Sequence, residues 1–363
     1  MSARRGKTKS RSKNQASAAA RSADTTVDLT RLLDIVATFP RRTLCVVGDF
    51  VLDQFVSGEI SRISREAPVL ILRHRRTEEY PGGAANAVNN LADLGARVLP
   101  VGVVGDDEGG KILLDYFRAK RIDSSGILRT RERATTTKTR YLAGWTHTTE
   151  QQVLRVDREP REELSERIQE SLSRKARKNA KSADAVLVSD YGLGAASPEI
   201  VRKLSAKRMT LDSRYRLLDY RNAAITAATP NEPELEAAYH VTVGNDMQKL
   251  EELGQRTLRD LDLDALVVTR GKDGMALFEK SADKDTRMRN IAIYGSDAPV
   301  DVTGAGDTVI AVFTLALAAG ASYLEAAHLA NYAGGIVVMK RRTATVTREE
   351  LEAVLRREAT AQR

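Results

Sequence analysis

Six short apolar segments recur along this chain of 363 residues and constrain its fold more than any other feature. Each ends in a polar residue or glycine, and a helical pattern usually follows. The segments cover residues 44–47, 98–104, 185–188, 209–211, 225–229 and 266–269. Short apolar strands separated by amphipathic helices are typical of parallel βαβ units, so we predict an α/β fold with a mostly parallel central sheet.

Polar residues follow these segments at each strand end, namely Asp49, Asp106, Asp190, Asp212, Asn231 and Arg270. Ligands of parallel sheets bind beyond the carboxyl ends of the strands, so the set can supply a polar site there. Helix caps and turns explain any one of these residues well, but they explain the whole set less well.

Two stretches, residues 54–80 and 134–157, interrupt this rhythm because they are rich in β-branched residues and alternate between apolar and polar side chains. They predict a small antiparallel sheet inserted into the larger domain. Such a flap beside the strand ends can close over a substrate and exclude water. It can equally expose an apolar face for dimerisation.

The net charge of +8 is concentrated at the N-terminus. Residues 1–25 hold seven Lys or Arg against one acidic residue, which leaves only +2 for the rest of the chain. We predict a disordered basic tail at 1–27, followed by one domain at 28–360. A solvated tail is the ordinary interpretation, so no nucleic-acid partner is expected; weak contact with RNA or anionic lipid, or a targeting role, stays open.

Bulk properties narrow the class of protein further. The single cysteine, Cys45, lies in an apolar segment, so disulfides are not expected, and this pattern favours a reducing cytoplasm. No apolar run is long and uncharged enough to span a bilayer, so no membrane association is expected. The sequence also lacks a Walker P-loop and any His/Cys cluster with zinc spacing.

The turn Asp-Val-Thr-Gly-Ala-Gly-Asp-Thr at 301–308 carries the strongest chemical signal. It places Asp307 on the first turn of an apolar helix that we expect to be buried and to stop near Gly320. The amides of Gly304, Ala305 and Gly306 would be helix-N-terminal donors suited to an anion. A carboxylate there is a poor anchor for the anion but can accept a proton from an attacking hydroxyl, which suggests phosphoryl transfer to an alcohol; a simple helix cap would require neither glycine.

Three motifs in this order resemble the ribokinase-like (PfkB) family of carbohydrate kinases, over roughly residues 43–355. They are the Pro-Gly-Gly-Ala-Ala-Asn-Ala run at 81–87, the Thr-Pro-Asn-Glu-Pro-Glu run at 229–234 and the 301–308 turn. The resemblance implies a three-layer α/β/α fold with a central, mostly parallel sheet and a small β-sheet lid. It also implies an enzyme that uses ATP and Mg²⁺, with K⁺ in some members.

Residues 48–53, 61–68, 78–83 and 189–191 are similar to the kinase module of bacterial ADP-heptose synthesis. This implies phosphorylation of the C1 hydroxyl of D-glycero-D-manno-heptose 7-phosphate, on the route to the lipopolysaccharide inner core. Bifunctional members carry a nucleotidyltransferase after the kinase, and this sequence stops near the end of the kinase, so a separate nucleotidyltransferase is expected. Dimers joined through their lids are common in the family, so a homodimer is expected.

On the acceptor side, the resemblance makes Asp307 the general base and assigns sugar contacts to Asp53, Gly82, Gly83 and Asn86. A tight turn or a solvated loop acid is the ordinary alternative for these positions. The 7-phosphate should meet a cation, and the candidates near the predicted flap are Arg62, Arg65, Arg140 and Arg155. Any one of the four could instead be an ordinary surface arginine.

On the nucleotide side, the resemblance makes Asn231 and Glu234 organisers of Mg²⁺ and phosphate, directly or through water. It suggests a phosphate loop at Thr269, Arg270, Gly271 and Gly274, for which a hairpin turn into residues 275–278 is the alternative. It places the adenine near Asn331 and Gly334, and a monovalent cation near Asp301 and Thr303.

Three departures from the relatives weaken the substrate prediction but not the reaction class. Asp212-Ser213-Arg214 replaces Asp-Pro-Lys, Lys340-Arg341-Arg342-Thr343 places arginine where relatives favour glycine, and Trp145-Thr146-His147 is unusual. A kinase for another sugar or sugar phosphate is therefore the nearest alternative. A non-catalytic sugar or nucleotide sensor is the alternative from another class, although it would not need Asp307.

Overall fold

The computed structural model describes residues 26–362 apart from 146–148, 281–286 and 297. Residues 1–25 of the predicted basic tail therefore lie outside the described residues, and the boundaries predicted for the tail and the domain stay predictions. No helix in the described part of the chain combines the length and the apolar character needed to cross a bilayer.

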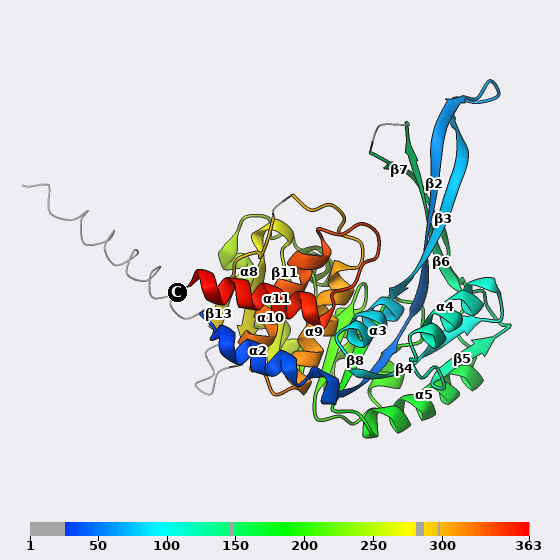
Figure 1. Ribbon diagram of the computed structural model, residues 1–363. Helices are drawn as coiled ribbons and strands as arrows, with labels where there is room; N and C mark the ends of the chain where they lie inside the picture. The colour runs from blue at the N-terminus through cyan, green and yellow to red at the C-terminus, as the bar shows by residue number, and fades with distance from the viewer. Residues whose placement is uncertain (1–25, 146–148, 281–286, 297, 363) are drawn as a thin grey trace, which may run out of the picture.

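A nine-stranded sheet forms the centre of the molecule, in the order β13-β12-β11-β10-β9-β8-β1-β4-β5 (Figure 1). All pairs from β11 to β5 are parallel, whereas β12 and β13 add an antiparallel edge. The strands are β1 (Thr43–Gly48), β4 (Arg97–Gly105), β5 (Ile127–Thr130), β8 (Ala185–Asp190), β9 (Met209–Ser213), β10 (Ala227–Ala228), β11 (Ala265–Thr269), β12 (Met275–Glu279) and β13 (Arg287–Ile291). The predicted α/β class is confirmed, although β10 is shorter than the apolar segment at 225–229.

Helices cover both faces of this sheet, because alternate residues of its strands point to opposite sides. In β1, Leu44 and Val46 belong to one apolar core, while Cys45 and Val47 belong to the other. The first core packs against α2 (Leu29–Ala37), α3 (Ala84–Asp93), α4 (Glu108–Ala119), α9 (Ala305–Ala318), α10 (Tyr323–Val337) and α11 (Arg348–Ala361). The second packs against α5 (Glu166–Lys181), α6 (Pro198–Val201), α7 (Glu232–Tyr239) and α8 (Met247–Leu261).

A second sheet, which we call the lid, projects from the body beside the carboxyl ends of the central strands (Figure 1). Its order is β3-β2-β6-β7, with β2 (Phe50–Ile63), β3 (Leu70–Gly83), β6 (Thr136–Gly144) and β7 (Gln151–Arg158). The prediction that this sheet is antiparallel is wrong for its central pair, because β2 and β6 run parallel. The two segments are separated by α3, β4, α4 and β5, and β6 enters the lid beside the start of β2, with Thr136 paired to Val51, so both strands run outward from the body.

Candidate active site

The turn before α9 forms as the glycines predict. Gly304 is the N-cap residue of α9 with φ of 80°, a left-handed conformation that glycine adopts at little cost. The Ala305 amide, predicted to face an anion, instead donates to the carbonyl of Val302 at 3.2 Å. The first intrahelical amide is that of Thr308, so within the described residues the amides of Gly306 and Asp307 lack a carbonyl partner. The amide of Gly304 likewise donates to no carbonyl among these residues, so Gly304, Gly306 and Asp307 carry the amides available to an anion.

Asp307 lies in the first turn of α9 and is 3% exposed. The Tyr191 hydroxyl donates to its Oδ1 at 2.8 Å, and Asn86 Nδ2 donates to its Oδ2 at 3.1 Å. Burial raises the pKa of the Asp307 carboxyl to about 7, although these two hydrogen bonds act to lower it. An exposed aspartate has a pKa of about 3.9, so burial makes the Asp307 carboxylate a stronger base than an ordinary aspartate.

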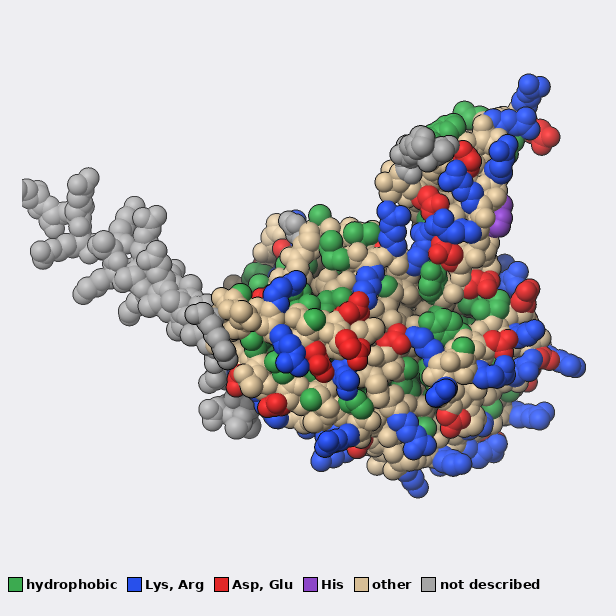
Figure 2. Space-filling view, in the orientation of Figure 1, with side chains coloured by type: hydrophobic (Ala, Val, Ile, Leu, Met, Phe, Trp, Pro, Cys, Tyr) green, Lys and Arg blue, Asp and Glu red, His purple; other side chains and the backbone are tan. Residues whose placement is uncertain are grey.

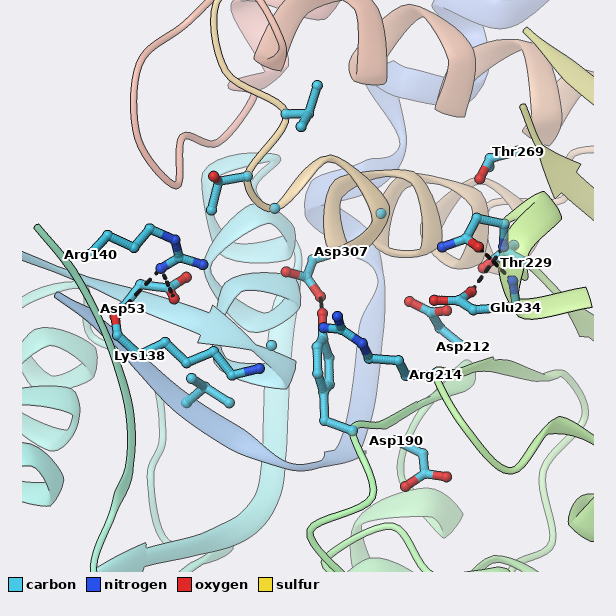
Figure 3. A pocket seen from close by; sticks show the side chains of 18 of the residues that line it. Asp53, Lys138, Arg140, Asp190, Asp212, Arg214, Thr229, Glu234, Thr269 and Asp307 are labelled. Carbon is cyan, nitrogen blue, oxygen red and sulfur yellow. Dashed lines mark hydrogen bonds and ion pairs between the residues drawn. The ribbon is translucent and has the colours of Figure 1, made fainter. Parts of the chain in front are cut away.

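A cavity of about 480 Å³ opens between the base of the lid and the carboxyl ends of the strands. Asp307 lies within it, between the Asp53–Arg140 pair on one side and Asp212 and Glu234 on the other (Figure 3). A second, more apolar cavity of about 220 Å³ adjoins the first, since Thr269, Val302 and Gly306 line both. The fold therefore brings the glycine turn to the boundary between two binding spaces.

The predicted sugar-contact residues divide into two groups. Asp53 and Gly83 line the larger cavity, whereas Gly82 and Asn86 do not. Gly82 lies against Asp53, because a Cβ at residue 82 would be 2.5 Å from Oδ2 of Asp53. Asn86 is fully buried and directs its amide to Asp307 and to the carbonyl of Gly304. In this structure Asn86 therefore positions the turn and its carboxylate and does not face the sugar space.

Four cations line the larger cavity: Lys138, Arg140, Arg155 and Arg214. Two of them are already paired, Arg140 with Asp53 at 2.6 Å and Arg155 with Asp157 through two hydrogen bonds. Lys138, which the sequence prediction missed, is 7% exposed and has Glu159 no closer than 3.8 Å. Arg62 and Arg65 do not line the cavity and lie in the exposed far end of the lid.

Arg214 is the least neutralised of these cations. In the described part of the chain its guanidinium forms no ion pair within 4 Å, although its charge acts on Asp212 and Glu234, and it lies 5.4 Å from the ring centroid of Tyr215. Burial and the positive charges of Arg214 and Arg155 lower the pKa of Lys138. Among the four cations, Lys138 and Arg214 are thus the least closely paired with carboxylates, which suits a site for a phosphorylated ligand.

The acidic strand-end residues have two different uses. Asp49 accepts hydrogen bonds from three backbone amides of the loop 191–195, and Asp190 pairs with Arg216. Asp107 caps α4 through the amide of Gly110. For Asp49 the alternative interpretation, caps and turns, describes the structure better than a ligand site, and the same holds for Asp107, whereas Asp190 lines the larger cavity while paired with Arg216.

Asp212 behaves differently, because it lines the cavity and has no side-chain hydrogen bond or ion pair among the described residues. Burial and the nearby charges of Glu234 and Asp307 raise its pKa well above the usual range. Carboxylates that lack an ion pair and lie next to the expected position of the phosphates are suited to bind a divalent cation. Within the described ranges no three acidic, His or Cys side chains could hold a metal ion by themselves, so such a cation would keep waters or phosphate oxygens.

Asn231 and Glu234, the predicted magnesium organisers, form a capping box at the start of α7. The Asn231 side chain accepts from the amide of Glu234 at 2.8 Å, and Glu234 Oε2 accepts from the amide of Asn231 at 2.9 Å. Both still line the larger cavity. Only Oε1 of Glu234 lacks a hydrogen bond among the described residues, so this oxygen is the one that can face a hydrated cation.

The smaller cavity contains the residues predicted for the nucleotide base and phosphates. Thr269, Gly271, Gly274, Asn331 and Gly334 all line it. The turn from β11 to β12 is also the predicted hairpin, since these two strands pair antiparallel. Gly274 has φ of 77°, and a Cβ there would be 2.1 Å from the carbonyl of Ile291, so only glycine fits. The Asn331 amide holds the segment 292–294 through Ala292 and Tyr294.

Asp301, one of the two residues predicted to lie near a monovalent cation, is bonded to the backbone on both sides of the catalytic turn. Oδ1 of Asp301 accepts from the amide of Thr303 at 3.0 Å, and Oδ2 accepts from the amide of Arg342 at 2.9 Å. Both carboxylate oxygens of Asp301 therefore serve the backbone. K⁺ stays a prediction that the Asp301 side chain does not support.

Comparisons with known proteins agree with this geometry. Residues 41–350 match the model of the pfkB family carbohydrate kinases. The chain therefore belongs to the pfkB family of carbohydrate kinases. Solved structures agree on the fold: phosphofructokinase-2 from Escherichia coli, in complex with substrates and products, has a TM-score of 0.68 at 16% identity over 89% of this chain and all of that one. Ribokinase from Arabidopsis thaliana, complexed with ribose and ATP, has a TM-score of 0.64 at 18% identity over 86% of this chain and 98% of that one.

Curated relatives narrow the similarity within the family. The chain is 39% identical to "Bifunctional protein HldE" of Desulfatibacillum aliphaticivorans over 88% of its own length and 64% of that protein. It is 40% identical to the protein of the same name from Geobacter sulfurreducens, over 84% of its own length and 61% of that protein. The chain thus spans less than two thirds of the length of these relatives.

Proposed function

We propose that this protein transfers the γ-phosphoryl group of ATP to the C1 hydroxyl of D-glycero-D-manno-heptose 7-phosphate and forms the 1,7-bisphosphate. The observation on which the proposal depends is the position of Asp307. This buried carboxylate lies in the larger cavity, one residue from the amide of Gly306. Family membership supports a kinase, and the similarity to the HldE proteins supports a heptose phosphate as the acceptor.

The chain's own residues would perform the following chemistry. Asp307 accepts the proton of the attacking hydroxyl while a new O–P bond forms and the bond to the leaving ADP oxygen breaks. Tyr191 and Asn86 hold the carboxylate during this transfer. The amides of Gly306 and Asp307 stabilise the negative charge of the migrating group through preorganised N–H donors.

Three groups of residues would place the ligands. Lys138 and Arg214, whose charges are least neutralised by the protein, and Arg155 bind the 7-phosphate or the migrating group. Asp212 and Glu234 hold hydrated Mg²⁺, which when bound neutralises the charge of the nucleotide phosphates. Thr269, Gly271, Gly274, Asn331 and Gly334 bind ATP in the smaller cavity.

The lid also suggests an assembly. Val153, Leu154 and Val156 on β7, together with Ile63, Val69 and Leu70 at the far end of β2 and β3, expose large apolar side chains. We propose that the lids of two copies cover these residues in a homodimer. A nucleotidyltransferase activity would then act further along the same route.

A panel of acceptors with coupled detection of ADP tests the function. The wild-type protein should turn over heptose 7-phosphate with a kcat/KM well above that for pentoses and ketose phosphates. Asp307→Asn should retain acceptor binding while turnover falls by roughly 10²–10⁴. Preference for another sugar would replace the substrate and keep the reaction class. Binding without turnover in the wild type would instead favour a non-catalytic sensor.

A further inference from the structure

Arg342 occupies an unusual backbone conformation next to the candidate active site. Its φ of 69° lies in the left-handed region, where a non-glycine residue persists only when its surroundings hold it. The side chain is only 12% exposed, although it belongs to a loop between α10 and α11. The sequence already marked this loop as one with arginine where related kinases favour glycine.

The guanidinium of Arg342 reaches into the lid. Its Nη2 bonds to Oε2 of Glu150 at 3.1 Å, Oε2 of Glu78 at 3.2 Å and Oγ of Ser57 at 3.3 Å. It also lies over the ring of Phe55, with 5.0 Å between the guanidinium carbon and the ring centroid. These partners come from β2, from β3 and from the residue just ahead of β7, so one side chain of the body contacts three segments of the lid.

The backbone amide of Arg342 contacts the segment that leads into the catalytic turn. Its amide donates to Oδ2 of Asp301, and the other oxygen of Asp301 accepts from the amide of Thr303, next to Gly304. The neighbouring Thr343 donates its hydroxyl to Oδ2 of Asp53 at 3.0 Å, at the base of the lid. The pair 342–343 therefore bonds to the lid and to the turn that precedes Asp307.

We propose that Arg342 is a positioning residue that fixes the lid relative to the catalytic turn. The acceptor hydroxyl is thereby placed where Asp307 can accept its proton. This inference rests on the proposed kinase function and deepens it. The ion pairs with Glu78 and Glu150 offset the free-energy cost of the left-handed φ at Arg342. That φ in turn directs the side chain toward the lid, where both carboxylates lie. A residue that merely stabilises the fold would not have to connect these two parts.

Three variants separate positioning from stability. Arg342→Ala removes the side chain and keeps the unfavourable φ, Arg342→Gly removes the side chain and relieves it, and Arg342→Lys keeps the charge without the planar fork. Arg121→Gly is the matched control, because Arg121 is an exposed arginine with φ of 57° that does not line the cavity. Thermal unfolding, steady-state kinetics and hydrogen exchange of lid peptides are measured for each.

If Arg342 positions the lid, Arg342→Gly and Arg342→Ala both raise the KM for the acceptor by about tenfold and lower kcat, while the KM for ATP stays within about twofold. Arg342→Gly melts at a higher temperature than Arg342→Ala but is no more active. Amides of residues 70–83 exchange faster in both variants, Arg342→Lys recovers part of the activity, and Arg121→Gly leaves kinetics unchanged.

Other results would overturn the inference. Kinetics that follow melting temperature across the three variants would make Arg342 a stabilising residue only, as would unchanged exchange in the lid. Glu78→Gln combined with Arg342→Ala should lose little more than Arg342→Ala alone, and full additivity contradicts a shared contact. An inactive wild type would count against the proposed function, and the exchange measurement would then decide the positioning role by itself.

Discussion

The hydroxyl of Tyr191 donates a 2.8 Å hydrogen bond to Oδ1 of Asp307, and the two side chains come from segments more than 100 residues apart. Asp307 is buried and Tyr191 is half-buried, and desolvation beside Asp307 raises the pKa of Tyr191 well above its usual range, so the phenol remains a donor at neutral pH. The bond leaves the Asp307 carboxylate oriented toward the cavity. Tyr191 follows the end of β8 and is thus held by the parallel sheet itself.

The pH dependence of turnover should follow Asp307. Its pKa of about 7 means that the basic form is lost as pH falls below 7, so kcat should decline by about tenfold per pH unit on the acid side. Tyr191→Phe removes a hydrogen bond that lowers this pKa, and its acid limb should therefore move to higher pH. Rate profiles from pH 5 to 9 measure the shift. An unchanged limb in Tyr191→Phe would remove Asp307 as the titrating group.

The contribution of Asp307 to folding stability should fall as pH rises, whereas turnover should increase. Because the folded pKa of Asp307 lies above its unfolded value near 3.9, its contribution to folding is fully present below that value and is lost as pH rises to about 7. Above pH 7 the wild type bears the cost of a buried charge, which Asp307→Asn removes. The variant should melt a few degrees higher than wild type at pH 8, with a smaller difference at pH 5. A lower melting temperature at pH 8 contradicts this account.

Lys138 should govern the affinity for a phosphorylated acceptor. Loss of a buried charge-assisted contact in Lys138→Met should raise the KM for the acceptor by about 10- to 100-fold and leave the KM for ATP nearly constant. Arg62→Met, which removes a cation at the exposed end of the lid, is the control and should behave as wild type. A larger effect on ATP than on the acceptor would assign Lys138 to the nucleotide phosphates.

Asp212 should set the requirement for Mg²⁺. Asp212→Asn removes an acidic side chain that has no partner in the described part of the chain, so half-saturation with Mg²⁺ should rise by about tenfold. Asp106→Asn, which alters an acid paired with Arg129 and Arg131 on the surface, serves as the control. Titration of activity with MgCl₂ at fixed ATP makes the comparison. Equal Mg²⁺ curves for all three proteins would exclude Asp212 from the cation site.

The sequence predicted much of the architecture because local chemistry decides it. The apolar segment ending at Val47 forms β1, and the glycines around Ala305 form the turn before a buried helix. The lid sheet was also predictable from alternation, but the direction of β6 relative to β2 was not. Strand direction depends on the end at which the chain re-enters the lid after α3, β4, α4 and β5, and the alternation of side chains within β6 carries no information about that.

The site was less predictable than the fold, because its side chains meet only in three dimensions. Lys138 reads as an ordinary polar residue of an alternating strand, yet it lies in the cavity near Asp307 (Figure 3). Asn86 lies in a glycine-rich motif and was assigned to the sugar, whereas its amide holds the carboxylate. The spacing of Asn231 and Glu234 is itself the signature of a capping box, so that local role could have been recognised from the sequence.

The basic residues of the lid also could not be distinguished from one another by sequence alone. Figure 2 shows Lys and Arg side chains gathered along the visible face of the lid and its junction with the body. The sequence gives no means to rank them. In the structure they differ in how closely each is paired with a carboxylate. Arg76 bonds to Glu78 at 2.9 Å, whereas the carboxylate of Glu159 lies 3.8 Å from Lys138.

The close approach of Gly82 to Asp53 limits how this protein can be redesigned. Any methyl group at position 82 would displace the carboxylate of Asp53, which in turn holds Arg140 and Thr343. Substitutions of Gly82 would therefore be eliminated in a directed evolution experiment that selects for new acceptors. Substitutions that change the acceptor should instead accumulate around Arg155 on β7, which lines the larger cavity on a strand with no buried residue.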